Sequence, residues 1–153
     1  MDANERQRLI DRYRNGHRVV AEALAGITDE ELDRSHEAGW TPRQIAHHLA
    51  DSEMEGATRI RRLLALESPT IIGYDEKAFA GLAADRPIAA SIEAFRAARE
   101  TTVQLLERMS DDDWSRIGTH TERGTYGTED WLTMYAAHAH DHAAQIRRAR
   151  GKQ

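Results

Sequence analysis

The residues best suited to chemistry in this sequence are histidines near its C-terminal end, where His138, His140 and His142 lie within the stretch HAHDHAAQIRRAR. A helix turns by about 100° per residue, so His142 lies about 40° from His138, whereas His140 lies about 200° away and is expected to face solvent. Two imidazoles at positions i and i+4 have the spacing to hold one divalent metal ion. The glutamate of the HExxH motif is absent, so a pair of structural histidines is the alternative.

A third imidazole would complete a three-histidine site with a coordination position left open for catalysis. The stretch GWTPRQIAHHLADSEMEG supplies two adjacent candidates, His47 and His48. On a helix, His48 borders the apolar stripe that contains Ile45 and Leu49, and His47 is turned about 100° away from it. The sequence therefore favours His48 as the third ligand and predicts that His47 is solvated.

Two further residues are candidates for catalytic roles beside such a metal. Arg99 lies in the centre of an apolar stripe, so it either clamps an anionic group or forms a buried salt bridge, for which Glu55 is a candidate partner. His120 lies in the glycine-containing segment 115–127, which is predicted to be a loop. There it either shuttles protons or contacts substrate, or makes only structural hydrogen bonds. The carboxylates that could orient the ligand imidazoles are Asp51, Glu53 and Asp141.

Four long amphipathic segments must position these residues. Apolar residues recur at three- and four-residue steps over residues 3–26, from 42 to before Pro69, over 87–106 and over 128–150. Thr41 and Thr128 are expected to cap the second and fourth helices, and Pro87 to open the third. The longest connection, 68–86, joins the second helix to the third and should contain a short helical turn over 75–82. The pattern predicts an all-α fold, a four-helix bundle formed by residues 1–153 as one domain. Trp40 and Trp131 are expected to be packing residues.

The composition limits the partners and the chemistry. Hydrophobic residues make up 40% and charged residues 31%, which is typical of a soluble globular protein. The net charge of −5 argues against nucleic-acid binding. No apolar run reaches the roughly 18–20 residues of a membrane span and the N-terminal segment has no apolar signal core, so a cytoplasmic location is expected. The absence of cysteine excludes thiolate ligands and a protein thiol nucleophile, so any thiol must be external.

Several motifs resemble the DinB-like metalloprotein superfamily, and most nearly its YfiT-like branch of metal-dependent hydrolases and thiol transferases. They are WTPRQIAHHLADSE at 40–53, YDEKAFA at 74–80, DDWxRxGxHxxxG at 112–124 and HxxxHxxQI at 138–146. The resemblance covers nearly the whole chain. It implies a four-helix bundle, often a homodimer, that holds a divalent metal, zinc or nickel, through His48, His138 and His142.

For some members the resemblance also implies transfer of bacillithiol, mycothiol or glutathione to an electrophile. We therefore predict a metal-dependent enzyme that transfers a small-molecule thiol, because no carboxylate in the sequence is a convincing general base. Metal-dependent hydrolysis and a non-catalytic, metal-binding stress-response bundle are the alternatives. A third alternative is a metal-free helical interaction module with buried histidines.

Overall fold

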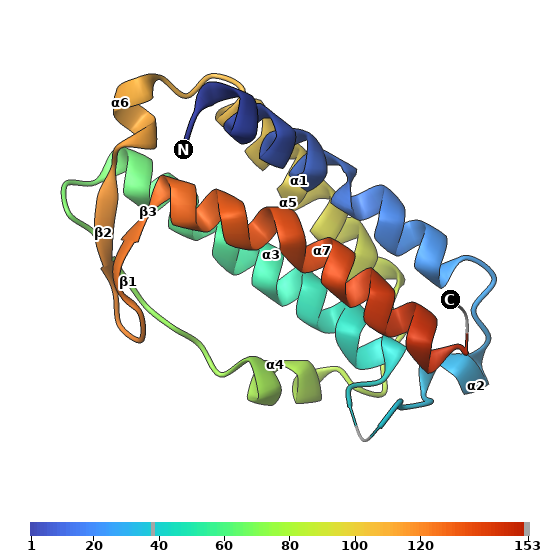
Figure 1. The fold of residues 1–153 in the computed structure, drawn as a ribbon. Coiled ribbons are helices and arrows are strands. Elements are labelled where there is room, and N and C mark those ends of the chain that lie inside the picture. The colour runs from blue at the N-terminus through green and yellow to red at the C-terminus, as the bar shows by residue number, and fades with distance from the viewer. Residues whose placement is uncertain (38, 152–153) are drawn as a thin grey trace.

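A computed structural model describes residues 1–37 and 39–151, so residue 38 and residues 152–153 of the predicted domain lie outside the described part. Four long helices form the predicted bundle (Figure 1), and they are α1 (Ala3–Leu24), α3 (Pro42–Ala65), α5 (Ala89–Leu106) and α7 (Thr128–Ala149). Three short helices are α2 (Asp29–Leu32), α4 (Glu76–Leu82) and α6 (Asp111–Trp114). No helix within the described residues is both long and apolar enough to cross a membrane.

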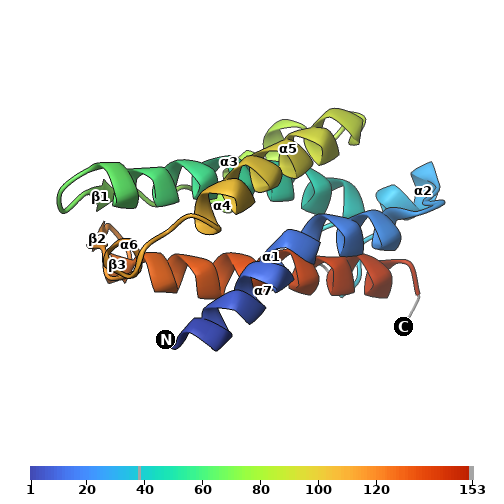
Figure 2. The ribbon, with the colours of Figure 1, turned by 90° about the horizontal axis from the view of Figure 1, so that it is seen from above.

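The four long helices form two layers, with α1 and α7 in one layer and α3 and α5 in the other (Figure 2). Helices α1 and α7 run in the same direction, and the amino group of Met1 contacts the Glu129 carboxylate where both begin. Helices α3 and α5 run in the opposite direction, and near their starts the His47 imidazole contacts the Ser91 hydroxyl. Because α3 and α5 are parallel, the connection between them must return along the length of the bundle.

The long helices begin close to the expected residues. Thr41 caps α3 as predicted, since its hydroxyl accepts from the Gln44 N–H and the Gln44 side chain accepts from the Thr41 N–H. Helix α7 is capped one residue earlier than predicted, at Gly127, whose N–H donates to the Asp130 carboxylate. The Thr128 hydroxyl, the expected cap, instead donates to the Asp113 and Trp114 carbonyls of α6, at 3.2 and 2.8 Å.

A small sheet replaces part of the predicted loop at 115–127. It comprises β1 (Thr70–Ile71), β2 (Ile117–His120) and β3 (Gly124–Gly127). Strands β2 and β3 form an antiparallel hairpin, and Gly124 adopts a φ of +75°, which favours glycine. Strand β1 pairs with β2 in parallel, so that Ile71 lies opposite His120. These strands were missed because they are short and because β1 lies far from β2 in the sequence.

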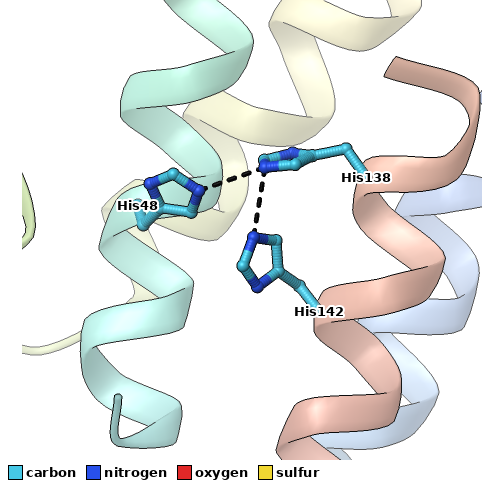
Figure 3. A group of neighbouring side chains, drawn as sticks. All are labelled: His48, His138 and His142. Atoms are coloured by element: carbon cyan, nitrogen blue, oxygen red, sulfur yellow. Dashed lines mark hydrogen bonds between the residues drawn. The ribbon is translucent and has the colours of Figure 1, made fainter. Parts of the chain in front are cut away.

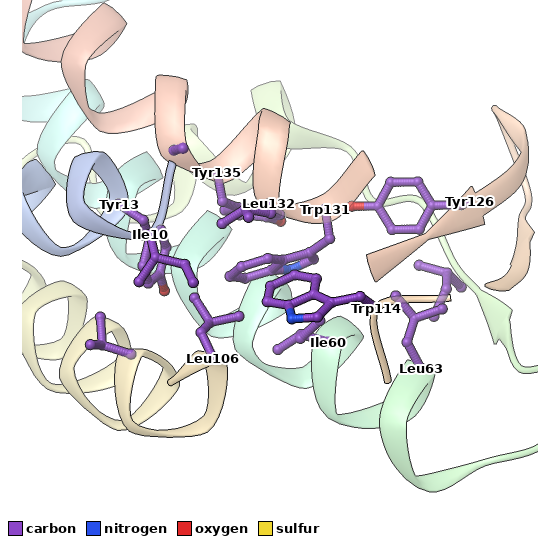
Figure 4. Packing of buried hydrophobic residues seen from close by; sticks show 13 residues of the cluster. Ile10, Tyr13, Ile60, Leu63, Leu106, Trp114, Tyr126, Trp131, Leu132 and Tyr135 are labelled. Carbon is purple, nitrogen blue, oxygen red and sulfur yellow. The ribbon is translucent and has the colours of Figure 1, made fainter. Parts of the chain in front are cut away.

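The hydrophobic core consists of two clusters along the bundle. The first lies at the hairpin end, where Trp131 stacks on Tyr135 with ring centroids 4.7 Å apart (Figure 4). The Trp131 indole N–H donates to the Gly56 carbonyl at 2.8 Å, which confirms that this tryptophan is a packing residue. The second cluster includes Val20, Ile45, Leu49, Phe95 and Ile146.

A buried ion pair between Arg99 and Glu53 joins the two clusters. Arg99 Nε and Nη2 donate to Glu53 Oε2 at 3.1 and 2.7 Å, and Nη1 donates to the Tyr13 carbonyl at 2.5 Å. The Tyr13 hydroxyl donates to the other Glu53 oxygen. The guanidinium carbon lies 4.0 Å from the Tyr13 ring centroid and 4.8 Å from that of Phe95. The predicted partner, Glu55, is wrong, because two residues turn a helix by about 200° and only Glu53 faces the core.

Close approach of α1 to this ion pair requires Gly16. A Cβ there would lie 2.1 Å from Arg99 Nη1 and 2.8 Å from the Ala139 Cβ. We expect Gly16→Ala to lower the free energy of unfolding, because overpacking of about 1–3 kcal/mol exceeds the gain of about 1 kcal/mol in helix propensity. The matched control is Gly81→Ala in α4, where a Cβ meets nothing. Urea unfolding midpoints measure both, and a Gly16→Ala midpoint at or above that of Gly81→Ala would contradict the packing argument.

Candidate metal centre

The structure brings together the three histidines that were predicted to bind metal. Helix α3 supplies His48, and α7 supplies His138 and His142 from successive turns, with the three rings pointing toward one another (Figure 3). His138 Nε2 lies 3.1 Å from His48 Nε2 and 3.1 Å from His142 Nε2. One nitrogen from each ring lies within 4.8 Å of the other two. Nitrogens that bind a tetrahedral zinc ion at about 2.0–2.1 Å are about 3.3–3.4 Å apart, so the two 3.1 Å separations from His138 are close to those of such a site.

The hydrogen-bond pattern of the three rings also fits a cation. His142 Nδ1 donates to the Gln145 Oε1 at 2.7 Å, so a neutral His142 presents the lone pair of its Nε2 to His138. The Nε2 atoms of His48 and His142 both lie 3.1 Å from His138 Nε2. A single proton on His138 Nε2 can form a hydrogen bond with only one of them at a time. A metal ion between the three Nε2 atoms would instead accept a lone pair from each, so the donor set fits a divalent metal.

Burial keeps all three imidazoles neutral at pH 7. It lowers the pKa of His48 to about 3, with a smaller contribution from the neighbouring His142. Burial lowers the pKa of His138 well below its ordinary value, and lowers that of His142 as well. Neutral rings have free lone pairs, which metal binding requires.

The other two histidines near the triad do not take part in it. His140 lies away from the triad as predicted, but it is half-buried rather than facing solvent, because it lies on the side of α7 that faces α1, where its Nε2 donates to the Arg12 carbonyl at 3.0 Å. The prediction that His47 is solvated is wrong, since this residue is only 4% exposed. Its ring nitrogens lie 2.8 Å from the Ser91 hydroxyl and 3.3 Å from the Arg86 carbonyl, because the start of α5 covers that face of α3.

A cleft of about 660 Å³ extends from the triad toward the hairpin. Trp40 forms part of its wall: this ring lies edge-on to His48, with centroids 4.7 Å apart, and parallel to His142 at 6.4 Å. Trp40 therefore contacts two of the candidate ligands, in addition to the packing role expected of it. Tyr135 also lines the cleft, with its ring 6.1 Å from that of His138.

The two residues predicted to be catalytic lie in different places. His120 is on β2 and lines the cleft, and its Nδ1 accepts from the Glu122 N–H, which leaves the proton of the neutral ring on Nε2. Burial lowers the His120 pKa, and the charge of Arg59 lowers it further. Arg99 is not among the residues that line the cleft. Arg99 instead forms a buried salt bridge, the alternative role predicted for it, with Glu53 as the partner.

Sequence reasoning did not identify two residues that contribute to the site. Gln145, rather than Asp51, Glu53 or Asp141, accepts a hydrogen bond from a ligand imidazole, and its position three residues after His142 was a usable signal. Arg59 lines the cleft, and its position eleven residues after His48 places it about 20° from that histidine on the helix.

We expect Gln145→Ala to weaken metal binding about 10- to 100-fold, because removal of a partner that orients a ligand imidazole has effects of this size. The control is Asp141→Asn, a change next to His142 in sequence that leaves the Gln145 hydrogen bond intact. Competition against a chromophoric chelator measures both dissociation constants. A larger loss for Asp141→Asn than for Gln145→Ala would contradict the assignment of Gln145.

Known proteins share the sequence pattern and the fold of this chain. The sequence model of the DinB superfamily matches residues 12–146. A protein of Oceanobacillus iheyensis named "Putative metal-dependent hydrolase" is 34% identical over 131 residues, which cover 84% of this chain and 76% of that protein. YfiT of Bacillus subtilis, which has the same descriptive name, is 33% identical over 131 residues, covering 83% and 74% of the two chains.

The fold agrees with these sequence matches. A solved structure of YfiT, described as "a probable metal-dependent hydrolase with an unusual four-helix bundle topology", aligns with a TM-score of 0.92 at 28% identity. The alignment covers 100% of this chain and 91% of that chain. The chain therefore belongs to the DinB superfamily and is similar to YfiT-like members in both sequence and fold.

Proposed function

We propose that this chain is a metal-dependent enzyme that transfers a small-molecule thiol to an electrophile at Zn²⁺ or Ni²⁺. The observation that supports the proposal is the convergence of three neutral imidazoles, His48, His138 and His142, on one end of a cleft. A divalent ion held only by neutral ligands keeps its full charge and lowers the pKa of a coordinated thiol or water, which supplies a nucleophile near neutral pH.

The chain itself contributes binding, orientation and shape. It contains no cysteine, so a reacting thiol must belong to the substrate. The cleft volume of about 660 Å³ lies within the usual range for small-molecule sites, and Trp40 and Tyr135 provide apolar walls beside the triad. Farther along the cleft, His120 offers its Nε2–H as a hydrogen-bond donor to the substrate.

Metal-dependent hydrolysis is the second candidate. The names of the similar proteins from Oceanobacillus iheyensis and Bacillus subtilis favour it. The same three imidazoles would serve both reactions, and the difference lies in whether water or a thiol attacks.

The experiment uses protein purified without a polyhistidine tag and loaded with Zn²⁺ or Ni²⁺. Bacillithiol, mycothiol and glutathione are each supplied with monochlorobimane, and a nitrophenyl ester supplied without thiol tests hydrolysis. We expect thiol conjugation by the wild type and none above background by His142→Ala. Ester hydrolysis that is independent of thiol and lost in the variant would favour the second candidate. Equal rates for the wild type and the variant in both assays would refute catalysis at the triad.

A further inference from the structure

The three buried arginines within the described part of the chain differ in how their charge is compensated. Arg99 binds the Glu53 carboxylate through two nitrogens, and Arg150 binds the Glu31 carboxylate through two nitrogens at 3.2 Å. Arg59, which is 7% exposed, donates one hydrogen bond, from Nη2 to the Ile72 carbonyl at 3.1 Å. Its Nε is buried without a hydrogen-bond partner.

No carboxylate among the described residues lies within hydrogen-bond distance of the Arg59 guanidinium. The Glu55 carboxylate is 3.9 Å from its Nε, beyond that range, and the Glu55 side chain is 39% exposed. Glu122 also lines this part of the cleft, but its carboxyl group lies against Gly73 and forms no ion pair with Arg59. Glu55 therefore forms only a long, solvent-exposed ion pair with Arg59, and the buried guanidinium keeps donors that no carboxylate of the described residues satisfies, which indicates a hydrogen-bonding partner from outside the chain.

Two other donors lie near Arg59 and also lack acceptors. The Arg59 guanidinium carbon lies 5.6 Å from the Tyr74 ring centroid, and the Tyr74 hydroxyl is buried without a hydrogen-bond partner. His120 is close enough for the Arg59 charge to lower its pKa, after the larger effect of burial, and no described residue accepts from its Nε2–H. A wall with several free donors is complementary to a ligand rich in acceptors.

Arg59 is positioned to act together with the triad. Eleven residues separate it from His48 on α3, so it lies on the same face of the helix and about 16 Å farther along it. Arg59, Tyr74, His120 and the three candidate ligands all line the same cleft. A molecule that extends along the cleft can therefore reach both ends at once.

We propose that Arg59, with Tyr74 and His120, binds a carboxylate of the substrate at the hairpin end of the cleft. The substrate is then an elongated, anionic small molecule whose reacting atom lies at the triad, and this second statement rests on the proposed function. The carboxylate accepts hydrogen bonds from the guanidinium and from the His120 Nε2–H, and it is the hydrogen-bonded anionic partner that the more distant Glu55 does not provide.

The test titrates glutarate into the full-length chain, both metal-loaded and metal-free after dialysis, and follows the Arg59 Nε–H signal by NMR. Glutaramide, the uncharged analogue of similar shape, is the matched ligand. We expect glutarate to shift this signal in both forms and glutaramide to leave it unchanged. An Arg59 signal that glutarate does not shift would overturn the proposal, and this outcome does not depend on whether any variant folds.

Calorimetry with variants of the metal-loaded protein provides the second measurement. Arg59→Gln is expected to weaken glutarate binding about tenfold or more, because a charge-assisted pair is lost. Arg123→Gln removes an exposed arginine that also lines the cleft, and is expected to have a much smaller effect. Equal losses in the two variants would overturn the assignment to Arg59. If the chain binds no metal but the metal-free titration succeeds, the proposed function fails while the carboxylate site stands.

Discussion

His138→Ala is expected to abolish stoichiometric binding of a divalent metal. His138 is the central residue of the triad, since its Nε2 lies 3.1 Å from that of each other histidine. Loss of a ligand leaves two imidazoles, and the effect should exceed the roughly 100-fold upper range for residues that only orient ligands. Metal analysis of tag-free protein by mass spectrometry and competition with a chelator measure the loss.

Thermal unfolding gives a second measurement of the same site. A metal at 100 times its dissociation constant stabilises the native wild-type chain by about 2.7 kcal/mol, which corresponds to several degrees in Tm for a chain of this size. His138→Ala should lose this response. His140→Ala should retain it, because that imidazole contacts the Arg12 carbonyl and not the triad. A wild-type chain that copurifies with no divalent metal and melts identically with and without chelator would instead support a metal-free interaction module.

Arg99→Met is expected to cause a large loss of stability. It removes the buried partner of Glu53, together with hydrogen bonds to the Tyr13 and Tyr135 carbonyls. Breaking a buried ion pair from one side costs about 3–5 kcal/mol, because the remaining charge stays buried without compensation. Urea denaturation monitored by circular dichroism measures the change in the free energy of unfolding.

Two further variants separate the ion pair from general effects of losing an arginine. Arg96→Met removes a residue one turn earlier on α5 whose salt bridges with Glu93 and Glu100 lie at the surface, and it should have little effect. The double substitution Arg99→Met with Glu53→Leu removes both buried charges, and should recover part of the stability lost in the single variant. A double variant less stable than Arg99→Met alone would contradict this explanation.

The sequence was sufficient to predict the long helices because their apolar spacing repeats over many turns and depends on no distant residue. The same regularity predicted that His138 and His142 share a face while His140 does not. His48 could be preferred over His47 only from its angle relative to the apolar stripe. The angle placed His48 correctly. The burial of His47 could not be predicted in this way, because it depends on the first turn of α5 and on the segment before that helix, about forty residues later in the chain.

The remaining features depend on contacts between distant segments. Strand β1 has only two residues, and its partner β2 lies beyond the whole of α5, so no local pattern indicates their pairing. The choice between Glu53 and Glu55 as the partner of Arg99 required knowing which face of α3 meets α5. That no carboxylate of the described residues hydrogen-bonds to Arg59 can be recognised only when the neighbouring side chains have been placed.

The two ends of the cleft are built from different kinds of segment. The triad end is built on packed helices, whereas the other end combines Arg59 of α3 with Tyr74 from the connection before α4 and His120 from the hairpin. Surface connections tolerate insertions and substitutions far better than helix interfaces do. Tyr74 and His120 can therefore vary without changes in the packed helices that carry the triad and Arg59. In evolutionary terms, the lining of this end of the cleft can change through the hairpin and the connection while the triad stays in place, and these two segments are the natural targets for library design.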